Sequence, residues 1–470
     1  MDKSPYLWIY LSENTRRRNK IMHIIYYTLI FILISLPVRA NERFLDIQEV
    51  KSKNGLTAWL VEDHSLPIIA MQFSFKGSGS INDPAEKQGR SKLLSNTLDE
   101  GAGNIDSQNF QKKLRDNSIA LGFSNSRDHF NGHLKTLTRY KEEAFNLLNL
   151  ALTKPKFDKE PIERMKQANI SRIRSSLTNP KWIAARIQND LIYKGHPYAL
   201  NSGGTISSLQ NLTADDLREF KDNYLTKDRL IIGVMGDITK EELQTQLDRI
   251  FGDLPDKQKN IQEMPAPEHK NGVYFYQKNI PQTVINISFP AFDRKDPDYY
   301  AAQVFNYILG GGGFGSRLME QAREKEGMTY GIYSSLDFLD NAQKLYISTS
   351  TKNDTVPRML EIIDQEIKRI KTEGITDKEL QNAKDYITGS LPLSLTSTNK
   401  IAKLLISLQK NERPLNYLDQ YKNNINSITK EDVLRVAQRI LKEEKINTVL
   451  VGKSSQKNNI TILKELPNVQ

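Results

Sequence analysis

The sequence of 470 residues contains no cysteine. This absence excludes disulfide bonds, a lipidated cysteine anchor, thiolate catalysis and cysteine-ligated zinc or iron–sulfur sites. Histidine is scarce as well, with six residues in the whole chain. No Gly-x-Ser-x-Gly nucleophile motif occurs either. The sequence therefore gives no support to a serine hydrolase or to a histidine-rich metal centre.

The chain also lacks long runs of charge of one sign. Its formal net charge is +10, and removal of residues 1–40, which hold six basic and two acidic residues, lowers it to +6. The remaining basic residues are interleaved with Asp and Glu. A solvated surface is the interpretation that fits this pattern, and we expect no nucleic-acid partner.

Residues 1–40 are expected to form a secretory signal peptide. Basic residues precede an apolar run from Ile24 to Leu36, and small residues at 38–40 fit a cleavage site before Asn41. The run of about thirteen residues is shorter than the roughly twenty that span a membrane. An uncleaved anchor and an internal start at Met22 stay open. Without cysteines, the mature chain is expected in the periplasm, with no stable membrane span.

The sequence repeats itself at a spacing of 216 residues. A Thr-x-x-Asp motif at 213–216 recurs at 429–432, and a glycine that closes an apolar run at 236 recurs at 452. Threonine followed three residues later by an acid is typical of a helix N-cap. Each half is therefore predicted to contain a capped helix that leads to a strand, and we infer an internal duplication.

A polar, proline-containing segment separates the two predicted domains. We place an N-terminal domain at 41–253, a linker at 254–272 and a C-terminal domain at 273–470. Alternating apolar patterns predict strands in both parts. Helical patterns are predicted between them, for example over Pro161–Ser176, Asp298–Leu309 and Asp377–Thr388. The expected fold class is α+β.

Residues 89–101 read Gly-Arg-Ser-Lys-Leu-Leu-Ser-Asn-Thr-Leu-Asp-Glu-Gly, and His-Pro-Tyr follows at 196–198. With later segments in the same order, they resemble the insulinase (pitrilysin, or inverzincin) family of metallopeptidases. That family binds Zn²⁺ through a His-x-x-Glu-His helix. Here Lys92, Ser95 and Asn96 replace the zinc-motif residues. Ammonium, hydroxyl and amide groups are poor zinc ligands, so we expect this chain to bind no metal or other cofactor.

The family's C-terminal signature is similar to Gly310–Leu318 followed by Arg323 and Tyr330. The resemblance implies two domains, each a mainly antiparallel sheet flanked by helices. It also implies that the arginine and the tyrosine face the zinc site and bind substrate or stabilise a transition state. We expect Gly327 to end the helix that carries Arg323 and Tyr330 to begin the next strand. The alternative interpretation is that Arg323 pairs with an acid of its own helix, Glu320 or Glu326.

A candidate substrate loop consists of Gly310, Gly311, Gly312, Gly313, Phe314 and Gly315. Such a loop either packs closely against the sheet or approaches an extended peptide. The second use is implied by resemblance to the zinc-less α subunit of mitochondrial processing peptidase. A dinucleotide site is disfavoured, although Gly-x-Gly-x-x-Gly is satisfied, because a helix is predicted before the loop where that site requires a strand.

The third zinc ligand of the family, a glutamate, corresponds to the region of Ser171 and Arg172. Glu163, earlier on the same predicted helix, is interpreted as a solvated carboxylate. His129 and His133 have metal-like spacing, but four residues along a strand separate two side chains by about 13 Å, which is too far for one ion. No alternative metal site is therefore favoured.

The sequence thus predicts a non-catalytic, substrate-binding subunit of a secreted zinc metallopeptidase complex that acts on peptides or unfolded protein. Resemblance to two-subunit bacterial members of the family implies a heterodimer whose partner carries the zinc. Alone, the chain is not expected to hydrolyse peptides. Two alternatives stay open, a stand-alone peptide-binding protein and a structural scaffold without a peptidase partner.

Overall fold

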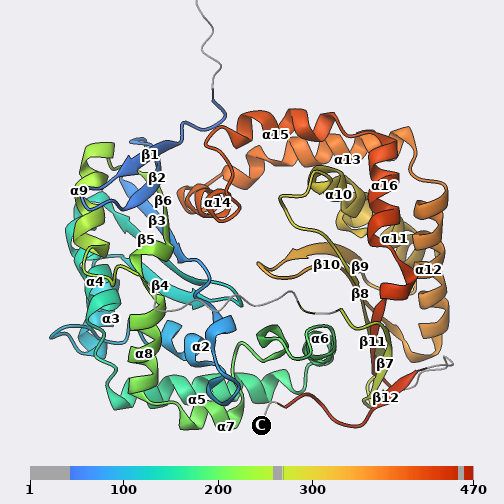
Figure 1. Ribbon diagram of the computed structural model, residues 1–470, viewed down its shortest axis with the longest axis horizontal. Coiled ribbons are helices and arrows are strands. Elements are labelled where there is room, and N and C mark those ends of the chain that lie inside the picture. The colour runs from blue at the N-terminus through green and yellow to red at the C-terminus, as the bar shows by residue number, and fades with distance from the viewer. Residues whose placement is uncertain (1–42, 258–266, 268, 454–459, 469–470) are drawn as a thin grey trace, which may run out of the picture. The chain divides into compact units, whose positions relative to one another are not determined.

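The computed structural model describes residues 43–257, 267, 269–453 and 460–468, and contains two six-stranded sheets (Figure 1). The expected signal peptide lies outside these residues. None of the described helices is long and apolar enough to cross a membrane. Leu45–Gln470 group into one compact unit. We call residues 45–257 the first half and residues 269–468 the second half.

The first sheet has the strand order β1-β2-β6-β3-β5-β4. Its strands are β1 (Gln48–Lys51), β2 (Thr57–Glu62), β3 (Ile68–Phe75), β4 (Ala120–Asn125), β5 (Phe130–Leu137) and β6 (Leu230–Gly236). Neighbouring strands are antiparallel except β2 and β6, which are parallel. A parallel pair requires a long crossover, and here residues 63–229, which hold most helices of the first half, lie between those two strands.

The second sheet repeats this order as β12-β7-β11-β8-β10-β9. Its strands are β7 (Gly272–Gln277), β8 (Gln282–Pro290), β9 (Ile332–Phe338), β10 (Gln343–Lys352), β11 (Asn447–Gly452) and β12 (Thr461–Leu463). The pair β7 and β11 is parallel, as β2 and β6 are, and β12 adds a second parallel neighbour to β7. The matching order of five strands agrees with the inferred duplication.

Helices connect and cover the strands of both sheets. In the first half they are α2 (Arg90–Ser95), α3 (Ser107–Asp116), α4 (Lys141–Thr153), α5 (Lys159–Ser176), α6 (Pro180–Ile192), α7 (Ile206–Asn211), α8 (Ala214–Tyr224) and α9 (Lys240–Phe251). In the second they are α10 (Tyr299–Asn306), α11 (Arg317–Met319), α12 (Val356–Thr372), α13 (Asp377–Ser390), α14 (Thr398–Lys410), α15 (Tyr417–Asn426) and α16 (Lys430–Ile440). The predicted α+β class, with two sheets flanked by helices, is confirmed, and the proposed domain boundaries stay a prediction.

The repeated Thr-x-x-Asp motifs form helix N-caps, as predicted. The side chains of Thr213 and Thr429 accept hydrogen bonds from the backbone N–H groups of Asp216 and Asp432 at the starts of α8 and α16. Each aspartate in turn accepts from the backbone N–H of its threonine, which completes a capping box. The duplication therefore preserves the local chemistry that starts this helix.

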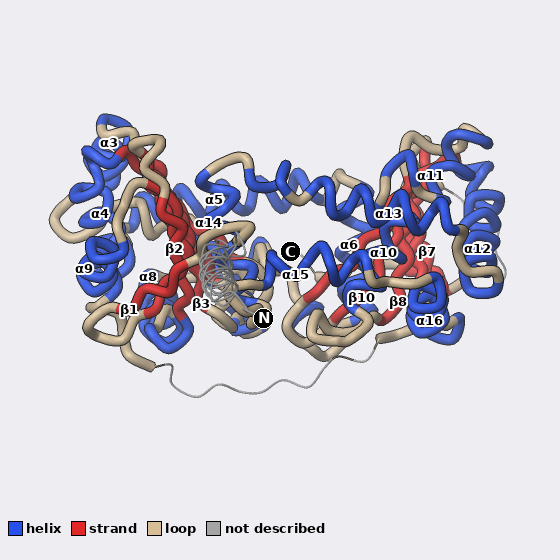
Figure 2. Tube along the Cα trace, turned by 90° about the horizontal axis from the view of Figure 1, so that it is seen from above, coloured by secondary structure: helices blue, strands red, loops and turns tan. Residues whose placement is uncertain are grey.

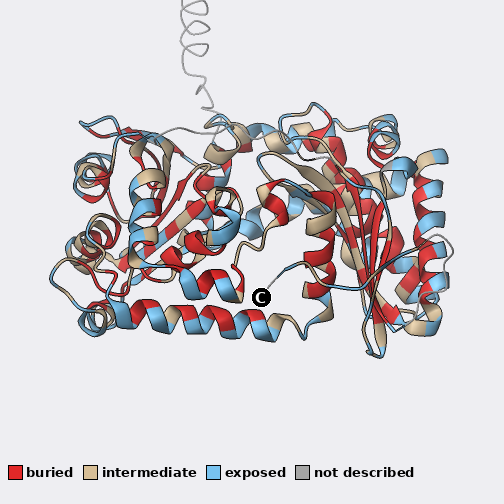
Figure 3. Ribbon diagram, turned by 60° about the horizontal axis from the view of Figure 1, so that its bottom comes forward, coloured by how far each residue is buried: buried red, intermediate tan, exposed pale blue. Residues whose placement is uncertain are grey.

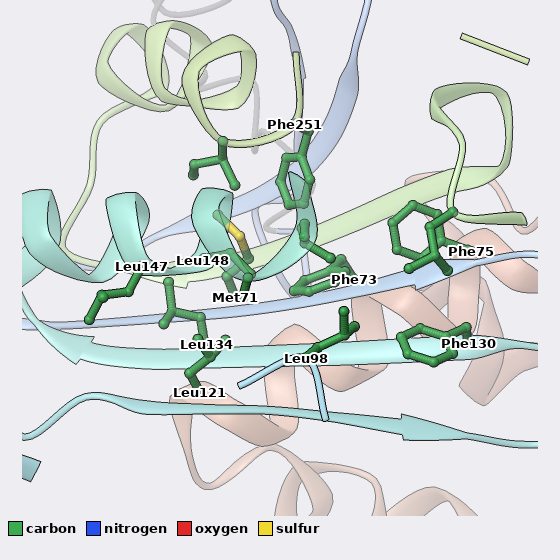
Figure 4. Packing of buried hydrophobic residues seen from close by; sticks show 14 of the residues in the cluster. Met71, Phe73, Phe75, Leu98, Leu121, Phe130, Leu134, Leu147, Leu148 and Phe251 are labelled. Atoms are coloured by element: carbon green, nitrogen blue, oxygen red, sulfur yellow. The ribbon is translucent and has the colours of Figure 1, made fainter. Parts of the chain in front are cut away.

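The core of the first half lies between its sheet and helices α4 and α9 (Figure 2). Apolar residues that alternate along β3 place Phe73 in this layer, and its ring lies 5.4 Å from that of Phe251 at an interplanar angle of 67° (Figure 4). The second half has a matching core under α12. Figure 3 shows that buried residues follow the strands of both sheets and one side of the helices around them.

The two halves exchange one helix each. Helix α14 of the second half packs on β6, β3 and β2 of the first sheet, and α6 of the first half packs on β11 and β8 of the second. The first contact buries Ile401, Ala402 and Leu405 with Trp59, Val61, Ala70 and Met235. The second buries Ile183, Ala184 and Ile187 with Tyr274, Val284, Val449 and Val451. Each sheet therefore has one face covered by the other half.

Candidate functional site

The degenerate zinc motif lies on the short helix α2, which packs against α5 and α8 (Figure 1). Five of its six residues are buried, and Lys92 is half-buried. The hydroxyl of Ser95 donates to the backbone carbonyl of Lys92 at 2.8 Å. The amide oxygen of Asn96 is buried with no hydrogen-bond partner among the described residues. The motif positions are therefore held in a well-packed helix.

A small pocket of about 100 Å³ opens beside Lys92. It is lined by Lys92, Asn169, Arg172, Ile173, Ser176, Trp182, Asn201 and Gly203. Burial lowers the pKa of Lys92, and the nearby positive charge of Arg172 lowers it further. Nη1 of Arg172 donates to the amide oxygen of Asn169 at 3.2 Å. The pocket wall thus carries two cations and two amides.

Of the two α5 positions that the sequence assigned to the third zinc ligand, Arg172 lines the pocket and Ser171 does not. Ser171 is exposed, whereas Asn169 lines the pocket and is only 4% exposed. The buried positions of α5 include 166, 169, 170 and 173, which share one helix face. The spacing of the apolar residues Ile170 and Ile173 in the sequence already indicated this buried face. The pocket residues Asn169, Trp182 and Asn201 were missed, because Trp182 and Asn201 come from separate segments with no motif of their own.

The groups around this pocket do not fit Zn²⁺. They are an ammonium, a guanidinium, amides and hydroxyls, none of which is a good zinc ligand. Within the described residues, no three His, Cys, Asp or Glu side chains gather closely enough to hold a metal ion. Glu163, on the same helix, pairs with Lys166 at 2.9 Å and is half exposed.

Of the two histidines with metal-like spacing, one lies just before β5 and the other within it. His129 precedes the strand and accepts a hydrogen bond from the backbone of Gly77 at 3.3 Å. His133 lies inside β5. Burial lowers both pKa values, that of His129 to about 3. His196 accepts a hydrogen bond from the backbone N–H of Tyr198 and packs on its ring, in keeping with the structural role expected for this motif.

The candidate substrate loop follows α10 directly. The helix continues as one π-helical turn, Tyr307–Gly311, and the loop then makes a 3₁₀ turn at Gly313–Gly315. The predicted helix before the glycines is thereby confirmed. A Cβ at Gly310 would lie 2.7 Å from the backbone nitrogen of Ser334 in β9. The start of the loop therefore packs against the sheet, while Phe314 at its far end is 62% exposed.

Arg323 lies on the π-helical turn Glu320–Lys325 and contacts the loop. Its guanidinium carbon is 4.6 Å from the centroid of the Phe314 ring. The alternative of an ion pair on its own helix is wrong, because both acids have other partners. Glu320 pairs with Lys325 at 2.8 Å, and Glu326 accepts from Nε of Arg358 at 3.0 Å. Gly327 has a φ of 59°, which suits the end of this helix.

Tyr330 is 86% exposed, more than any other large apolar or aromatic side chain in the described residues. No hydrogen bond joins it to Arg323 in the described part of the chain. It does not begin the next strand, as the sequence predicted, because β9 starts at Ile332. Thr329 accepts a hydrogen bond from the backbone N–H of Gly331 at 3.0 Å, which forms a turn before the strand. Tyr330 therefore projects from the short connection before β9.

The helix after the loop is anchored by a buried ion pair. Arg317 donates from Nε and Nη2 to the two carboxylate oxygens of Glu379, at 2.6 and 2.9 Å. Burial opposes ionisation of Glu379, but the hydrogen bonds from Arg317 and Thr376 outweigh it and lower its pKa to about 2. Two parallel bonds fix orientation as well as distance. The pair fixes the position of α11, which links the loop to Arg323.

Two family models match most of the described chain. Residues 74–200 match the insulinase family (peptidase family M16), and residues 211–387 match the peptidase M16 inactive domain. The first match includes the degenerate zinc helix, and the second includes the loop, Arg323 and Tyr330. The chain belongs to the insulinase family. It is an inactive homologue within that family, with Lys92, Ser95 and Asn96 at the zinc-motif positions.

Relatives with similar sequences match about four fifths of the chain. A non-peptidase homolog from Helicobacter pylori, YmxG, is 25% identical over 374 residues, which are 79% of this chain and 86% of that protein. The β subunit of mitochondrial-processing peptidase from Saccharomyces cerevisiae is 24% identical over 413 residues, 84% of this chain and 88% of that protein. The crystal structure of a peptidase M16 inactive domain from Pseudomonas fluorescens has a TM-score of 0.82 and 26% identity, covering 88% of this chain and all of that one.

Proposed function

We propose that this protein is the non-catalytic, substrate-binding subunit of a periplasmic zinc metallopeptidase complex. Its partner is an insulinase-family chain that retains His-x-x-Glu-His, and the substrate is a peptide or an unfolded protein segment. The similarity to a subunit of mitochondrial-processing peptidase supports a two-chain arrangement. The loss of the metal-binding groups supports a role outside the chemical step itself.

One observation carries the proposal: within the described residues Arg323 forms no ion pair and Tyr330 is 86% exposed, so the polar groups of both are available to a ligand. The ion pairs that would occupy Arg323 on its own helix are made by other residues. Tyr330 is almost fully exposed, and Phe314 and Tyr333 expose aromatic surface nearby in the sequence. Exposed aromatic side chains and arginine are the residue types that dominate binding sites.

These side chains have complementary tasks in binding a peptide. The exposed aromatic rings offer apolar surface to side chains of an extended substrate. The guanidinium and the phenol donate hydrogen bonds to a backbone carbonyl, and those bonds strengthen when the oxygen gains negative charge. Zinc in the partner would supply the activated water. This chain holds and polarises the substrate and neither makes nor breaks a bond itself.

The test is reconstitution. A tagged copy of this chain is purified from the periplasm of its own host, and a co-purifying chain with an intact His-x-x-Glu-His motif is identified. The two chains are then expressed separately and mixed. We expect peptide hydrolysis that requires both chains and is stopped by a chelator. A partner that is equally active without this chain would contradict the proposal, and peptide binding with no such partner would favour the stand-alone binding protein.

A further inference from the structure

The pocket beside α2 is lined by cations and amides in place of zinc ligands. We propose that it binds a carboxylate group, supplied by an acidic side chain or by the C-terminus of a peptide. The site of the lost zinc centre would thus recognise an anion in the substrate. This inference deepens the proposed function, because it names a chemical feature of the peptide that the subunit selects.

The pocket concentrates positive charge without a compensating acid. Lys92 on α2 and Arg172 on α5 both line it, and neither forms an ion pair with a carboxylate in the described chain. None of the eight lining residues is acidic. Burial lowers the pKa of Lys92, and repulsion from the charge of Arg172 lowers it further. A bound carboxylate would relieve this repulsion and pair with both groups.

Asn169 adds a hydrogen-bond donor that has no partner. Its amide nitrogen is buried and unpaired in the described structure, while its amide oxygen accepts from Arg172. A buried unpaired donor is costly to keep. When an anion takes the donor of Arg172, the amide is free to turn its N–H toward the same anion. The side chain then contributes a third donor to the site.

A larger cavity in the same chain shows a different arrangement of charge. It has a volume of about 390 Å³, and its basic lining residues lie among acids. Lys295, for example, pairs with Glu412 at 2.7 Å, and Lys76 pairs with the same carboxylate at 3.8 Å. Charges there are compensated from within the protein. At about 100 Å³, the pocket beside α2 has room for roughly three water molecules, which is enough for a carboxylate group.

Trp182 provides a direct reporter, because its side chain lines the pocket. The sequence has two other tryptophans, Trp8 and Trp59. In the full-length Trp8→Phe, Trp59→Phe protein, fluorescence therefore reports on Trp182 alone. We expect a saturable change with sodium acetate, with a Kd of roughly millimolar order. Sodium chloride at the same ionic strength is expected to give no saturable change.

Variants distinguish specific binding of a carboxylate in the pocket from nonspecific attraction of anions to the surface. Lys92→Met and Arg172→Gln are each expected to raise the Kd for acetate at least about tenfold, because each removes a charged hydrogen-bond donor. Lys92→Arg, which keeps the charge, is expected to retain binding. The matched control is Arg174→Gln, on the same helix but outside the lining of the pocket. A response that chloride reproduces, or that survives in both Lys92→Met and Arg172→Gln, overturns the proposal.

Two further probes identify the source of the carboxylate. N-acetylglutamate α-amide carries only a side-chain carboxylate, and N-acetylglutamine carries only a terminal one. Tighter binding of the first supports selection of acidic side chains, and tighter binding of the second supports selection of C-termini. Absence of a response to acetate and to both probes overturns the inference. These titrations need no partner chain, so they distinguish failure of this inference from failure of the peptidase complex.

Discussion

The guanidinium of Arg323 is stacked on the ring of Phe314, with 4.6 Å between the guanidinium carbon and the ring centroid. This contact ties the arginine to the end of the glycine-rich loop instead of to an acid of its own helix. A cation–π contact at an exposed site contributes about 0.5–1 kcal/mol and leaves the N–H groups at the edge of the guanidinium available. The arginine is therefore oriented while its donors stay free for a ligand.

Removing either donor is expected to impair the peptidase complex without dissociating it. Arg323→Ala or Tyr330→Phe should lower kcat/KM by about 10²-fold if the lost donor faces the developing oxyanion. Steady-state kinetics of the reconstituted complex measure this effect, and size-exclusion chromatography checks assembly. Glu324→Gln is the matched control on the same helical turn, at an exposed position, and should keep full activity. Full activity in both test variants would show that the pair has no such role.

The purified chain is expected to contain far less than one zinc per molecule, because the donor set around α2 does not fit the ion. Elemental analysis after dialysis measures this. About one tightly bound zinc per chain, lost on mutation of His129 or His133, would overturn the prediction.

Rebuilding the zinc site tests the placement of its third ligand. Lys92→His, Ser95→Glu and Asn96→His together should bind zinc weakly. Adding Asn169→Glu should increase zinc affinity, because position 169 lines the pocket beside α2. Adding Ser171→Glu instead should not, because that residue is exposed. Isothermal titration with zinc compares the two proteins. Equal affinities would contradict the assignment of Asn169 to the third position.

Acid is expected to weaken the anchor of α11. The pKa of Glu379 falls from an ordinary 4.5 to about 2 in the folded protein, so the pair contributes its full stability above pH 4.5 and loses it as the pH falls toward 2. Urea unfolding at a series of pH values should show a smaller loss over this window in Glu379→Gln than in the wild type. Glu373→Gln, at an exposed position nearby, is the control and should behave as the wild type does.

Limited proteolysis tests the boundary between the halves. The first cut is expected within 254–272, where the sequence is polar and rich in proline. The two fragments should nevertheless elute together, because α6 and α14 are each buried on the other half's sheet. Gel filtration of the cut protein followed by denaturing electrophoresis shows this. A first cut inside either half would count against the boundary.

The fold could be predicted from the sequence wherever local chemistry determines it. The capping motifs at Thr213 and Thr429 and the glycines at 236 and 452 repeat at a fixed spacing, so the duplication could be predicted from the sequence. The packing of α6 and α14 on the sheet of the other half could not be predicted from the sequence. Both helices are amphipathic, and their apolar residues do not indicate which sheet they cover.

The sequence predicted which residues belong to the candidate site but not how their side chains are arranged. Lys92, Ser95, Asn96 and Arg323 follow from motif positions. The stacking of Arg323 on Phe314 and the exposure of Tyr330 depend on the conformation of the connections between helices, which the motif does not specify. On α5, Asn169 and Arg172 line the pocket, whereas Ser171, which lies between them in the sequence, does not. Only the helix orientation, set by packing of Ile170 and Ile173, decides this difference.

The exchanged helices also determine the order in which the protein folds. The face of the first sheet formed by Trp59, Val61, Ala70 and Met235 is complete once β6 has formed, but its cover, α14, begins 162 residues later, at Thr398. Contacts so distant in sequence form slowly and leave apolar strand surface open in the meantime. The amino-terminal half therefore finishes folding only after nearly the whole chain has been made. Produced alone, it would expose this apolar face and aggregate.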